Sequence, residues 1–358
     1  MACNEALHVR QDVLLAPYTT MGVGGPARYF AEATAEDQVL AALEFASNRS
    51  LPLFVLGGGS NVLVSDSGFA GLVLRILLQG IQFSRLEGGI VSASAGEDWD
   101  SFVHACVARN LAGIECLSGI PGTVGGTPVQ NVGAYGQEVS EVILSVRALD
   151  RSSRTTVELN NSQCGFGYRS SLFNASERDR YIVLAVTYRL QPGGRPRIAY
   201  EDLVRHFDGQ GSDATLADVR AAVLQIRAAK GMVLAAGDPD CRSVGSFFKN
   251  PIVSQDEASR VEEAARLAGL LAPGASIPRF RASGGMIKLP AAWLIERAGF
   301  PKGYARGRTG LSSKHALALI NRGDATAGDV LELMREIQDT VRRLFDIDLL
   351  PEPVFVGF

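Results

Sequence analysis

The chain has 358 residues, of which 46% are hydrophobic and 20% are charged, and its formal net charge at pH 7 is -3. This length suggests two or three domains, each large enough to bury its own core. The charge balance excludes the strongly basic surface typical of nucleic-acid binding. The N-terminal segment lacks a basic region followed by an apolar one, and no apolar run reaches the roughly 18 residues of a membrane span. We therefore expect a cytoplasmic protein without membrane insertion.

The cysteines are few and irregularly spaced. The sequence contains five, and no C-x-x-C pair occurs among them. An odd number at such spacing argues against both a disulfide framework and a zinc site. We expect buried or incidental thiols at Cys3, Cys106, Cys116, Cys164 and Cys241.

The first third of the chain alternates between helix-like and strand-like patterns. Thr34 is placed to cap a helix, and residues 53–56 form a short apolar run typical of a buried strand. Residues 90–95 look extended, and an apolar stripe over residues 99–110 predicts another helix.

The remaining chain is first strand-rich and then helical. Three strands separated by polar turns are expected within residues 142–190, as an antiparallel or mixed sheet. Amphipathic helices are expected over residues 216–226, after the capping box of Ser254 and Glu257, and after Thr326.

A glycine run, "GGGSN", directly follows the strand predicted at residues 53–56. It fails the dinucleotide-binding fingerprint, because a third glycine would fall on Val62, and no Gly-Lys-Ser/Thr follows as in a phosphate-binding loop. A tight turn would explain it. Its backbone N–H groups could also converge on an anion such as a diphosphate, with hydroxyl and amide donors beside them.

A second stretch, "GIPGTVGGTPVQNVGAYG" at residues 119–136, contains six glycines, two prolines and no charged residue. Its glycines allow the backbone to approach a flat ligand, and Gln130, Asn131 and Tyr135 offer neutral hydrogen-bonding groups. This pattern favours a heterocycle. The alternative is a long surface loop, which is uncommon at this length unless it is functional.

Polar residues also stand in three apolar or glycine-rich settings: Arg169 in "CGFGYRSSLF", Ser246 and Lys249 in "GSFFKNP", and Glu352 in "LLPEPVFVGF". Taken singly, a salt-bridged arginine, a turn serine and a solvated glutamate would explain them.

The order of these motifs resembles the UDP-N-acetylenolpyruvoylglucosamine reductases, flavoenzymes of bacterial peptidoglycan synthesis. The resemblance runs from about Tyr18 to the C-terminus and also includes "TTMGVGGPARYF" and "AAWLIERAGFPKG". It implies an α+β fold of three domains. Two of them form an FAD-binding unit of the PCMH (vanillyl-alcohol oxidase-like) type, and the third binds the substrate. The expected boundaries are 1–79 with 346–358, 80–234 (with a PCMH-type region at about 23–193), and 235–345.

The resemblance also implies where FAD binds. The first loop would hold the diphosphate and the second loop the isoalloxazine ring. The residues that match are Gly57, Gly58, Gly59, Ser60 and Asn61 in the first loop, and Pro121, Gly122, Gly125, Gln130, Gly133, Ala134 and Tyr135 in the second.

The implied reaction reduces UDP-N-acetylglucosamine enolpyruvate to UDP-N-acetylmuramate with NADPH, placing a hydride on C3 of the enolpyruvyl group and a proton on C2. Arg169 would stabilise the enolate-like charge, Glu352 would donate to it as a neutral carboxyl, and Ser246 would protonate C2. "RPRIAYEDLVRHF" resembles the substrate-clamping loop of the type I enzymes, which implies substrate contacts at Tyr200, Lys230, Lys249 and Asn250. Lys230 is also the candidate cation beside Ser246.

Two other functions compete with this hypothesis. One is an FAD-linked oxidase of the same flavin-binding superfamily with a different small substrate. The other is a nucleotide-sugar sensor that retains the pockets without the chemistry. We expect a monomer, and the sequence leaves the role of His315 open.

Overall fold

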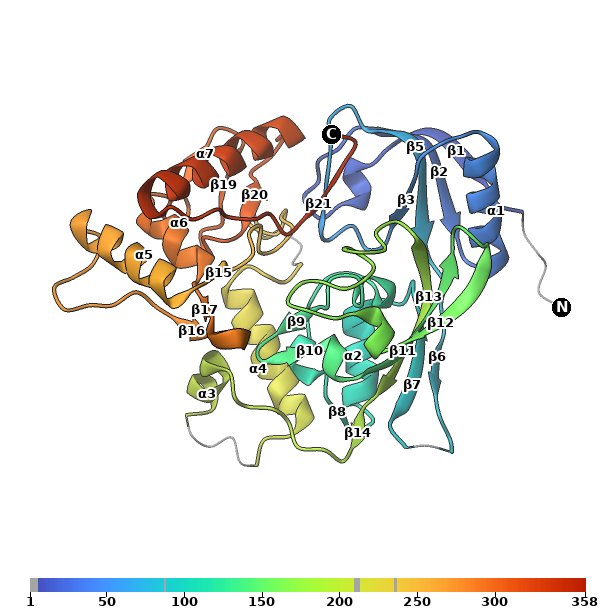
Figure 1. Ribbon diagram of the computed structural model, residues 1–358. Coiled ribbons are helices and arrows are strands. Elements are labelled where there is room, and N and C mark those ends of the chain that lie inside the picture. The colour runs from blue at the N-terminus through green and yellow to red at the C-terminus, as the bar shows by residue number, and fades with distance from the viewer. Residues whose placement is uncertain (1–5, 87, 209–212, 235–236) are drawn as a thin grey trace. The chain divides into compact units, whose positions relative to one another are not determined.

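The computed structural model describes residues 6–86, 88–208, 213–234 and 237–358 (Figure 1). The chain folds into two compact units, each assembled from several segments. The first unit consists of Met1–Leu14, Pro26–Gly59 and Gly68–Val233, and the second of Leu15–Gly25, Ser60–Ser67 and Leu234–Phe358. The division into three domains expected from the sequence follows different boundaries and stays a prediction.

The first unit contains a four-stranded sheet in the order β1-β2-β5-β3. Strands β2 and β3 both run parallel to β5, whereas β1 is antiparallel to β2. Parallel strands need a crossover, and helix α1 connects β2 to β3 and buries its apolar side in the same core as the sheet (Figure 1). The elements are β1 (Val9–Leu14), β2 (Pro26–Ala33), α1 (Glu36–Asn48), β3 (Leu53–Leu56) and β5 (Phe69–Ile76).

The prediction that Thr34 caps this helix is wrong. The N-cap is Ala35, whose side chain offers no acceptor. Instead, Gln38 reaches back, and its Oε1 accepts hydrogen bonds from the backbone N–H and the hydroxyl of Thr34, at 2.8 and 3.1 Å. Thr34 therefore stabilises the helix start as a donor to Gln38 rather than as the capping acceptor.

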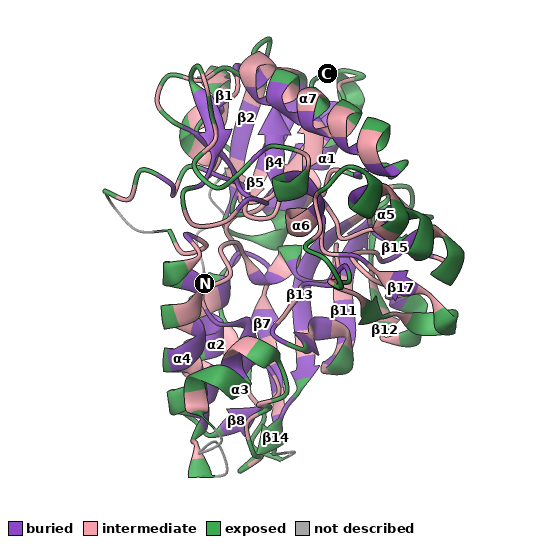
Figure 2. Ribbon diagram, turned by 90° about the vertical axis from the view of Figure 1, so that its left-hand side faces the viewer, coloured by how far each residue is buried: buried purple, intermediate pink, exposed green. Residues whose placement is uncertain are grey.

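A five-stranded sheet in the order β12-β11-β13-β7-β6 forms the second part of this unit, and all of its pairings are antiparallel. This confirms the strands predicted within residues 142–190. Most apolar residues of β7, β11 and β13 are buried, as the purple segments in Figure 2 show. The elements are β6 (Ile81–Phe83), β7 (Ile90–Ser94), β11 (Ile143–Asp150), β12 (Thr155–Asn160) and β13 (Tyr181–Arg189).

The described part of the first unit also contains three α-helices and two short strand pairs. Helix α2 begins at Trp99 after Asp98, which caps it by accepting from the Ser101 N–H, and it ends at Val107. Helix α4 buries one side, although Arg227 lies on that side among apolar residues. The elements are α2 (Trp99–Val107), α3 (Glu201–Phe207), α4 (Leu216–Ala229), β8 (Leu111–Ala112) with β14 (Gln191–Pro192), and β9 (Gly133–Ala134) with β10 (Gln137–Glu138).

The second unit has its own core, in which helix α7 supplies a long apolar face (Figure 2). The predicted capping box of Ser254 and Glu257 on α5 is confirmed. The helix predicted after Thr326 is also confirmed, and Thr326 caps it by accepting from the Asp329 N–H. The last strand, β21, pairs in parallel with β4. The elements are β4 (Val62–Val64), β15 (Ile252–Val253), α5 (Gln255–Leu267), β16 (Phe280–Arg281), β17 (Ile287–Lys288), α6 (Ala291–Arg297), β18 (Ala305–Arg306), β19 (Thr309–Leu311), β20 (Leu319–Asn321), α7 (Ala327–Phe345) and β21 (Val354–Val356).

The cysteines that the structure describes have free thiols, and most of them are buried. Cys106, Cys116 and Cys164 are buried and free, and Cys241 is free and half-buried. Burial raises the pKa of the Cys106 thiol to about 12, so it stays protonated near neutral pH. Cys3 lies outside the described residues.

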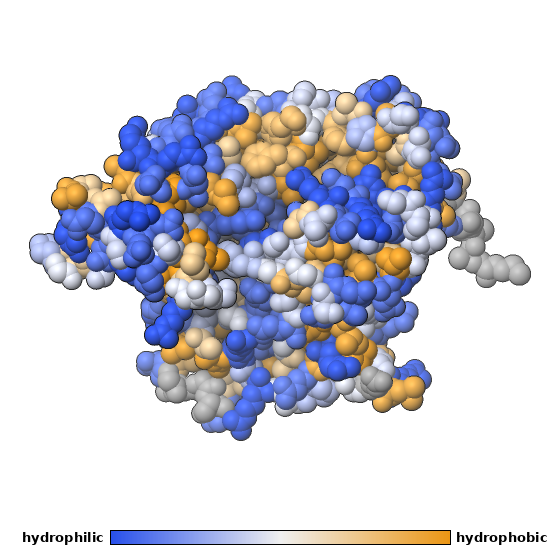
Figure 3. All heavy atoms as spheres, in the orientation of Figure 1, coloured by the Kyte–Doolittle hydropathy of each residue, from blue (hydrophilic) through white to orange (hydrophobic). Residues whose placement is uncertain are grey.

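Hydrophilic and hydrophobic residues are interspersed on the face shown in Figure 3. Among the described residues, no helix combines the length and the apolar character that crossing a membrane requires.

Candidate active site

The two glycine-rich loops of the first unit meet backbone to backbone. A Cβ atom added to Gly58 would lie 2.7 Å from the Cα of Gly122, and one added to Gly57 would lie 2.9 Å from the Oγ1 of Thr123. Gly59 has a φ of 66°, in the left-handed region that favours glycine. The glycines therefore allow an approach between the loops that side chains would block.

The connection between β7 and α2 fixes the first half of the second loop. The Gly125 N–H donates to the Ala95 carbonyl at 2.9 Å, and the Gly122 carbonyl accepts from the Trp99 N–H at 3.1 Å. A Cβ at Gly125 would lie 2.6 Å from that of Ala95. By contrast, a Cβ at Gly126 would have no described protein atom within 4 Å. The loop thus rests on the protein at Gly125 and has space beside it at Gly126.

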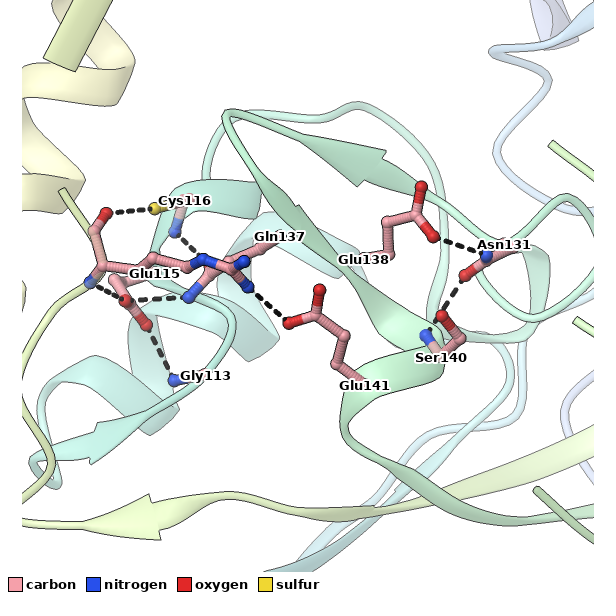
Figure 4. Close-up of polar contacts among 9 residues, drawn as sticks. Gly113, Glu115, Cys116, Asn131, Gln137, Glu138, Ser140 and Glu141 are labelled. Atoms are coloured by element: carbon pink, nitrogen blue, oxygen red, sulfur yellow. Dashed lines mark hydrogen bonds and ion pairs between the residues drawn. The ribbon is translucent and has the colours of Figure 1, made fainter. Parts of the chain in front are cut away.

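Asn131 fixes the second half of the loop. Its amide nitrogen donates to Glu138 Oε2 at 2.9 Å and to the Gly167 carbonyl at 3.0 Å, and its oxygen accepts from the Ser140 N–H at 3.1 Å. Figure 4 shows Asn131 between Glu138 and Ser140. The sequence suggested that Asn131 offers polar groups to a ligand. In the structure these groups hold the loop together. The sequence analysis did not predict that Asn131 is buried or that it has a left-handed backbone, with a φ of 46°.

Arg169 is anchored on the second loop. Its Nη2 donates to the Gly133 carbonyl at 2.7 Å, and its own backbone carbonyl accepts from Asn174. Its φ is 52°, a conformation that costs a non-glycine residue about 1–3 kcal/mol and is concentrated at functional sites. The structure therefore brings Arg169 next to Gly133 of the second loop.

Tyr135, Tyr200 and Lys230 lie together. The rings of the two tyrosines meet edge to face with centroids 5.4 Å apart, and the Lys230 ammonium lies 5.6 Å from the Tyr135 centroid. Lys230 also forms an ion pair with Asp202 at 2.5 Å. Burial raises the pKa of Tyr135 to about 12, so its hydroxyl is neutral at physiological pH.

The sequence analysis did not single out Arg227, because it follows the apolar stripe of a predicted helix. It is 7% exposed, its Nη2 donates to the Met232 carbonyl at 2.7 Å, and its Nε has no hydrogen-bond partner among the described residues. Its Nε would lie 3.3 Å from a Cβ at Gly119, at the start of the second loop. Burial lowers the pKa of its guanidinium, and Tyr135 and Asp100 counteract that effect. Arg227 thus places a buried cation beside the loop.

The remaining predicted residues belong to the second unit, where Glu352 and Asn61 are neighbours. The Glu352 carbonyl accepts from Asn61 Nδ2 at 3.4 Å, and the Val354 N–H donates to the Asn61 carbonyl at 2.9 Å. The Glu352 N–H donates to the Phe247 carbonyl at 2.9 Å, next to Ser246. The structure thus brings Asn61, Ser246 and Glu352 into one region of this unit.

Lys249 and Asn250 lie a few residues after Ser246 in the same segment of the second unit. The Lys249 N–H donates to the Leu350 carbonyl at 2.9 Å, and Asn250 Oδ1 accepts from the Ala291 N–H at the first residue of α6. The side-chain oxygen of Asn250 therefore satisfies one of the N–H groups that have no partner within the helix at the start of α6. His315 Nδ1 accepts from the Leu317 N–H at 3.0 Å, which is a local turn contact.

The structure therefore divides the predicted site residues between its two units. The first unit holds Gly57, Gly58, Gly59, Pro121, Gly122, Gly125, Gln130, Gly133, Ala134, Tyr135, Arg169, Tyr200 and Lys230, and the second holds Ser60, Asn61, Ser246, Lys249, Asn250 and Glu352. Their individual roles stay predictions.

Comparison with known proteins finds two family models that match parts of this chain. Residues 27–160 match the model of an FAD binding domain, and residues 238–356 match that of the UDP-N-acetylenolpyruvoylglucosamine reductase C-terminal domain. The protein of that name from Thermobifida fusca is 47% identical over 97% of this chain and 98% of its own length. The chain belongs to the UDP-N-acetylenolpyruvoylglucosamine reductase family.

Other members of the reductase family extend the match. The relative from Streptomyces coelicolor is 45% identical over 99% of this chain and 91% of its own length. The crystal structure of the reductase from Thermus caldophilus covers 98% of this chain and 100% of its own, with a TM-score of 0.67 at 26% identity. The predicted fold class is confirmed: an α+β protein with an FAD-binding region of the PCMH type and the C-terminal domain of the reductase family.

Proposed function

We propose that this protein reduces UDP-N-acetylglucosamine enolpyruvate to UDP-N-acetylmuramate, with FAD as cofactor and NADPH as reductant. Relatives that match nearly the whole chain carry the name of this activity. The observation that carries the proposal is the pair of touching glycine-rich loops with Arg169 anchored on one of them. The FAD-linked oxidase alternative is disfavoured, since the C-terminal third matches the reductase family's own domain.

The residues present fit FAD. The loops approach each other at Gly58 and Gly122, and Gly126 leaves space that a Cβ would fill. Neutral groups suit a flavin ring, and converging backbone N–H groups suit a diphosphate. We assign the diphosphate to Gly57, Gly58, Gly59, Ser60 and Asn61, and the ring to Pro121, Gly122, Gly125, Gln130, Gly133, Ala134 and Tyr135.

FAD, when bound, supplies the relay that passes a hydride from NADPH to C3 of the enolpyruvyl group. With a proton delivered to C2, the C=C bond becomes saturated and NADPH is oxidised to NADP⁺, so atoms and electrons balance. Negative charge grows on C2 and on the carboxylate before the proton arrives. The protein must therefore stabilise an enolate and supply one proton.

Arg169 is suited to the first task, because a guanidinium binds a carboxylate through two parallel N–H bonds. Its anchoring on Gly133 limits its rotamer freedom, so less reorganisation is needed as the charge develops. Glu352 would assist as a neutral carboxyl donor. Ser246 would protonate C2, a transfer that is downhill from a hydroxyl to a carbanion-like centre.

Tyr200, Lys230, Lys249 and Asn250 would bind the sugar nucleotide. Lys230 supplies a cation for a phosphate, and Asp202 and the ring of Tyr135 keep its ammonium in place. This pairing in the first unit supports the role of Lys230 in substrate binding, whereas its role beside Ser246 rests on the family resemblance. We also propose that the protein is cytoplasmic and acts as a monomer. Light scattering of the purified protein would test the oligomeric state.

The purified protein should be yellow and should lose its visible flavin absorption when NADPH is added without oxygen. Addition of the enolpyruvyl sugar nucleotide should then restore the absorption and yield UDP-N-acetylmuramate. Oxygen-driven turnover with an alcohol substrate, and none with the sugar nucleotide, would favour the oxidase. A colourless protein that binds the sugar nucleotide without turnover would favour the sensor.

Replacement of Gly58 by alanine should prevent FAD retention. The new Cβ would lie 2.7 Å from the Gly122 Cα, so the two loops must separate. The flavin content after purification measures the effect. Gly88→Ala is the matched control in the same unit, because its Cβ would make only an ordinary contact, 3.5 Å from Pro192 Cγ. A Gly58→Ala variant with full flavin content would contradict the assignment of this loop.

A further inference from the structure

Glu115 is a buried carboxylate to which the sequence analysis gave no role. It is 1% exposed and lies four residues before the second glycine-rich loop. Its Oε2 accepts from the Gly113 N–H at 2.7 Å, and its Oε1 accepts from Gln137 Nε2 at 2.8 Å and from the Arg197 N–H at 3.0 Å. Figure 4 shows Glu115 beside Gln137 and Cys116. Three donors thus converge on one side chain.

Only a carboxylate satisfies all three donors. The Cys116 N–H donates to Gln137 Oε1 at 2.8 Å, which fixes the orientation of that amide and directs its Nε2 toward Glu115. A glutamine at position 115 would place its own NH₂ group against at least one N–H. Because the site is buried, an N–H without an acceptor would carry its full desolvation cost.

The third donor connects Glu115 to another segment. Cys116 Sγ donates to the Arg197 carbonyl at 3.3 Å, so residues 115 and 116 hold both the backbone N–H and the carbonyl of Arg197. Arg197 precedes Tyr200 by three residues, and Tyr200 contacts Tyr135 of the second loop edge to face. The guanidinium of Arg197 adds an exposed ion pair with Glu141 at 2.7 Å.

We propose that Glu115 is a positioning residue that aligns the segment carrying Tyr200 with the loop carrying Tyr135. Through Gln137 it holds the end of the loop assigned to the flavin, and through the Arg197 N–H it holds the segment assigned to the sugar nucleotide. Loss of the Arg197 contact alone should weaken substrate binding and leave the chemistry intact. This inference rests on the proposed function, and it adds the residue that sets the position of Tyr200.

A swap of the two side chains separates these contacts. In Glu115→Gln alone, the new NH₂ group faces at least one N–H donor. This variant should have a lower thermal stability and a higher KM for the enolpyruvyl sugar nucleotide. In the double variant Glu115→Gln/Gln137→Glu, the new carboxylate at 137 accepts from the Cys116 N–H and from the amide at 115, whose oxygen still accepts from Gly113. Only the Arg197 N–H then lacks its acceptor.

We expect the double variant to keep the FAD content of the unchanged protein and its rate of flavin reduction by NADPH, with a Tm below that of the unchanged protein because the Arg197 N–H lacks its acceptor. Its KM for the enolpyruvyl sugar nucleotide should stay about tenfold higher, with kcat nearly unchanged. Glu44→Gln, on the exposed side of α1, is the control for the same chemical change. Glu141→Gln tests the exposed ion pair, which should contribute little.

A double variant with the KM of the unchanged protein, or with a lowered kcat at unchanged KM, would overturn the inference. A double variant that loses FAD, or that is reduced more slowly by NADPH, would contradict the hydrogen-bond assignment on which it rests. Failure of the unchanged protein to turn over the sugar nucleotide would instead refute the proposed function, so the two failures are distinguishable.

Discussion

Ser246→Ala is expected to leave the reduction of bound FAD by NADPH nearly unchanged and to slow its reoxidation by the enolpyruvyl sugar nucleotide by about 10²–10⁴-fold. The first half-reaction does not need the proton that Ser246 would deliver to C2. The second half-reaction cannot finish without it. Stopped-flow absorbance of the two half-reactions, recorded separately, measures the difference.

Ser259→Ala is a suitable control, since this serine lies in the same unit on the exposed side of α5 and donates to the Gln255 carbonyl of its own helix. Both half-reactions should keep their rates in this variant. An equal loss of both half-reactions in Ser246→Ala would refute the assignment of Ser246 as the proton donor.

Arg169→Lys should retain FAD but lower the rate of the second half-reaction by about 10²–10³-fold. The lysine keeps the positive charge but loses the planar fork that binds a carboxylate through two N–H groups. It also loses the fixed geometry that the hydrogen bond from Nη2 to Gly133 provides. Single-turnover oxidation of the reduced enzyme by the sugar nucleotide measures the effect.

The chain offers a matched control at Arg154. This residue also has a left-handed backbone, with a φ of 58°, and its guanidinium is exposed at the turn between β11 and β12. Arg154→Lys should therefore show any effect of placing a lysine on a left-handed backbone. It should not slow the reaction. If Arg169→Lys reacts as fast as Arg154→Lys, the proposed stabilisation of the enolate by Arg169 is wrong.

Local patterns predicted the helices and strands well, because those elements depend on neighbouring residues. The capping box of Ser254 and Glu257 and the strand at residues 53–56 are examples. Thr34 failed, because hydroxyl residues before a helix usually accept a hydrogen bond, whereas here Gln38 competes as the acceptor. The conformation of the Gln38 side chain therefore determines whether Thr34 donates or accepts at the helix start, and the local sequence pattern does not show that conformation.

The glycines and Arg169 could be selected from sequence, since their types and settings are unusual. The roles of Asn131, Glu115 and Arg227 could not, because each depends on partners that are distant in sequence. The sequence does contain one indication for Glu115, because it is the sole charged residue in "LAGIECLSGI". An isolated charge in an apolar run requires buried partners, and Gln137 and Arg197 supply them.

The pairing of β4 with β21 has a consequence for the order in which the protein matures during synthesis. Asn61 is synthesised early, but the N–H of Val354 that binds its carbonyl belongs to strand β21, which is synthesised much later. Domains generally fold as units, beginning from the N-terminus during synthesis. Here Gly57, Gly58 and Gly59 belong to the first unit, whereas Asn61 depends on its contact with Val354. The nascent chain therefore cannot complete this loop, and with it the proposed cofactor site, before β21 has been synthesised.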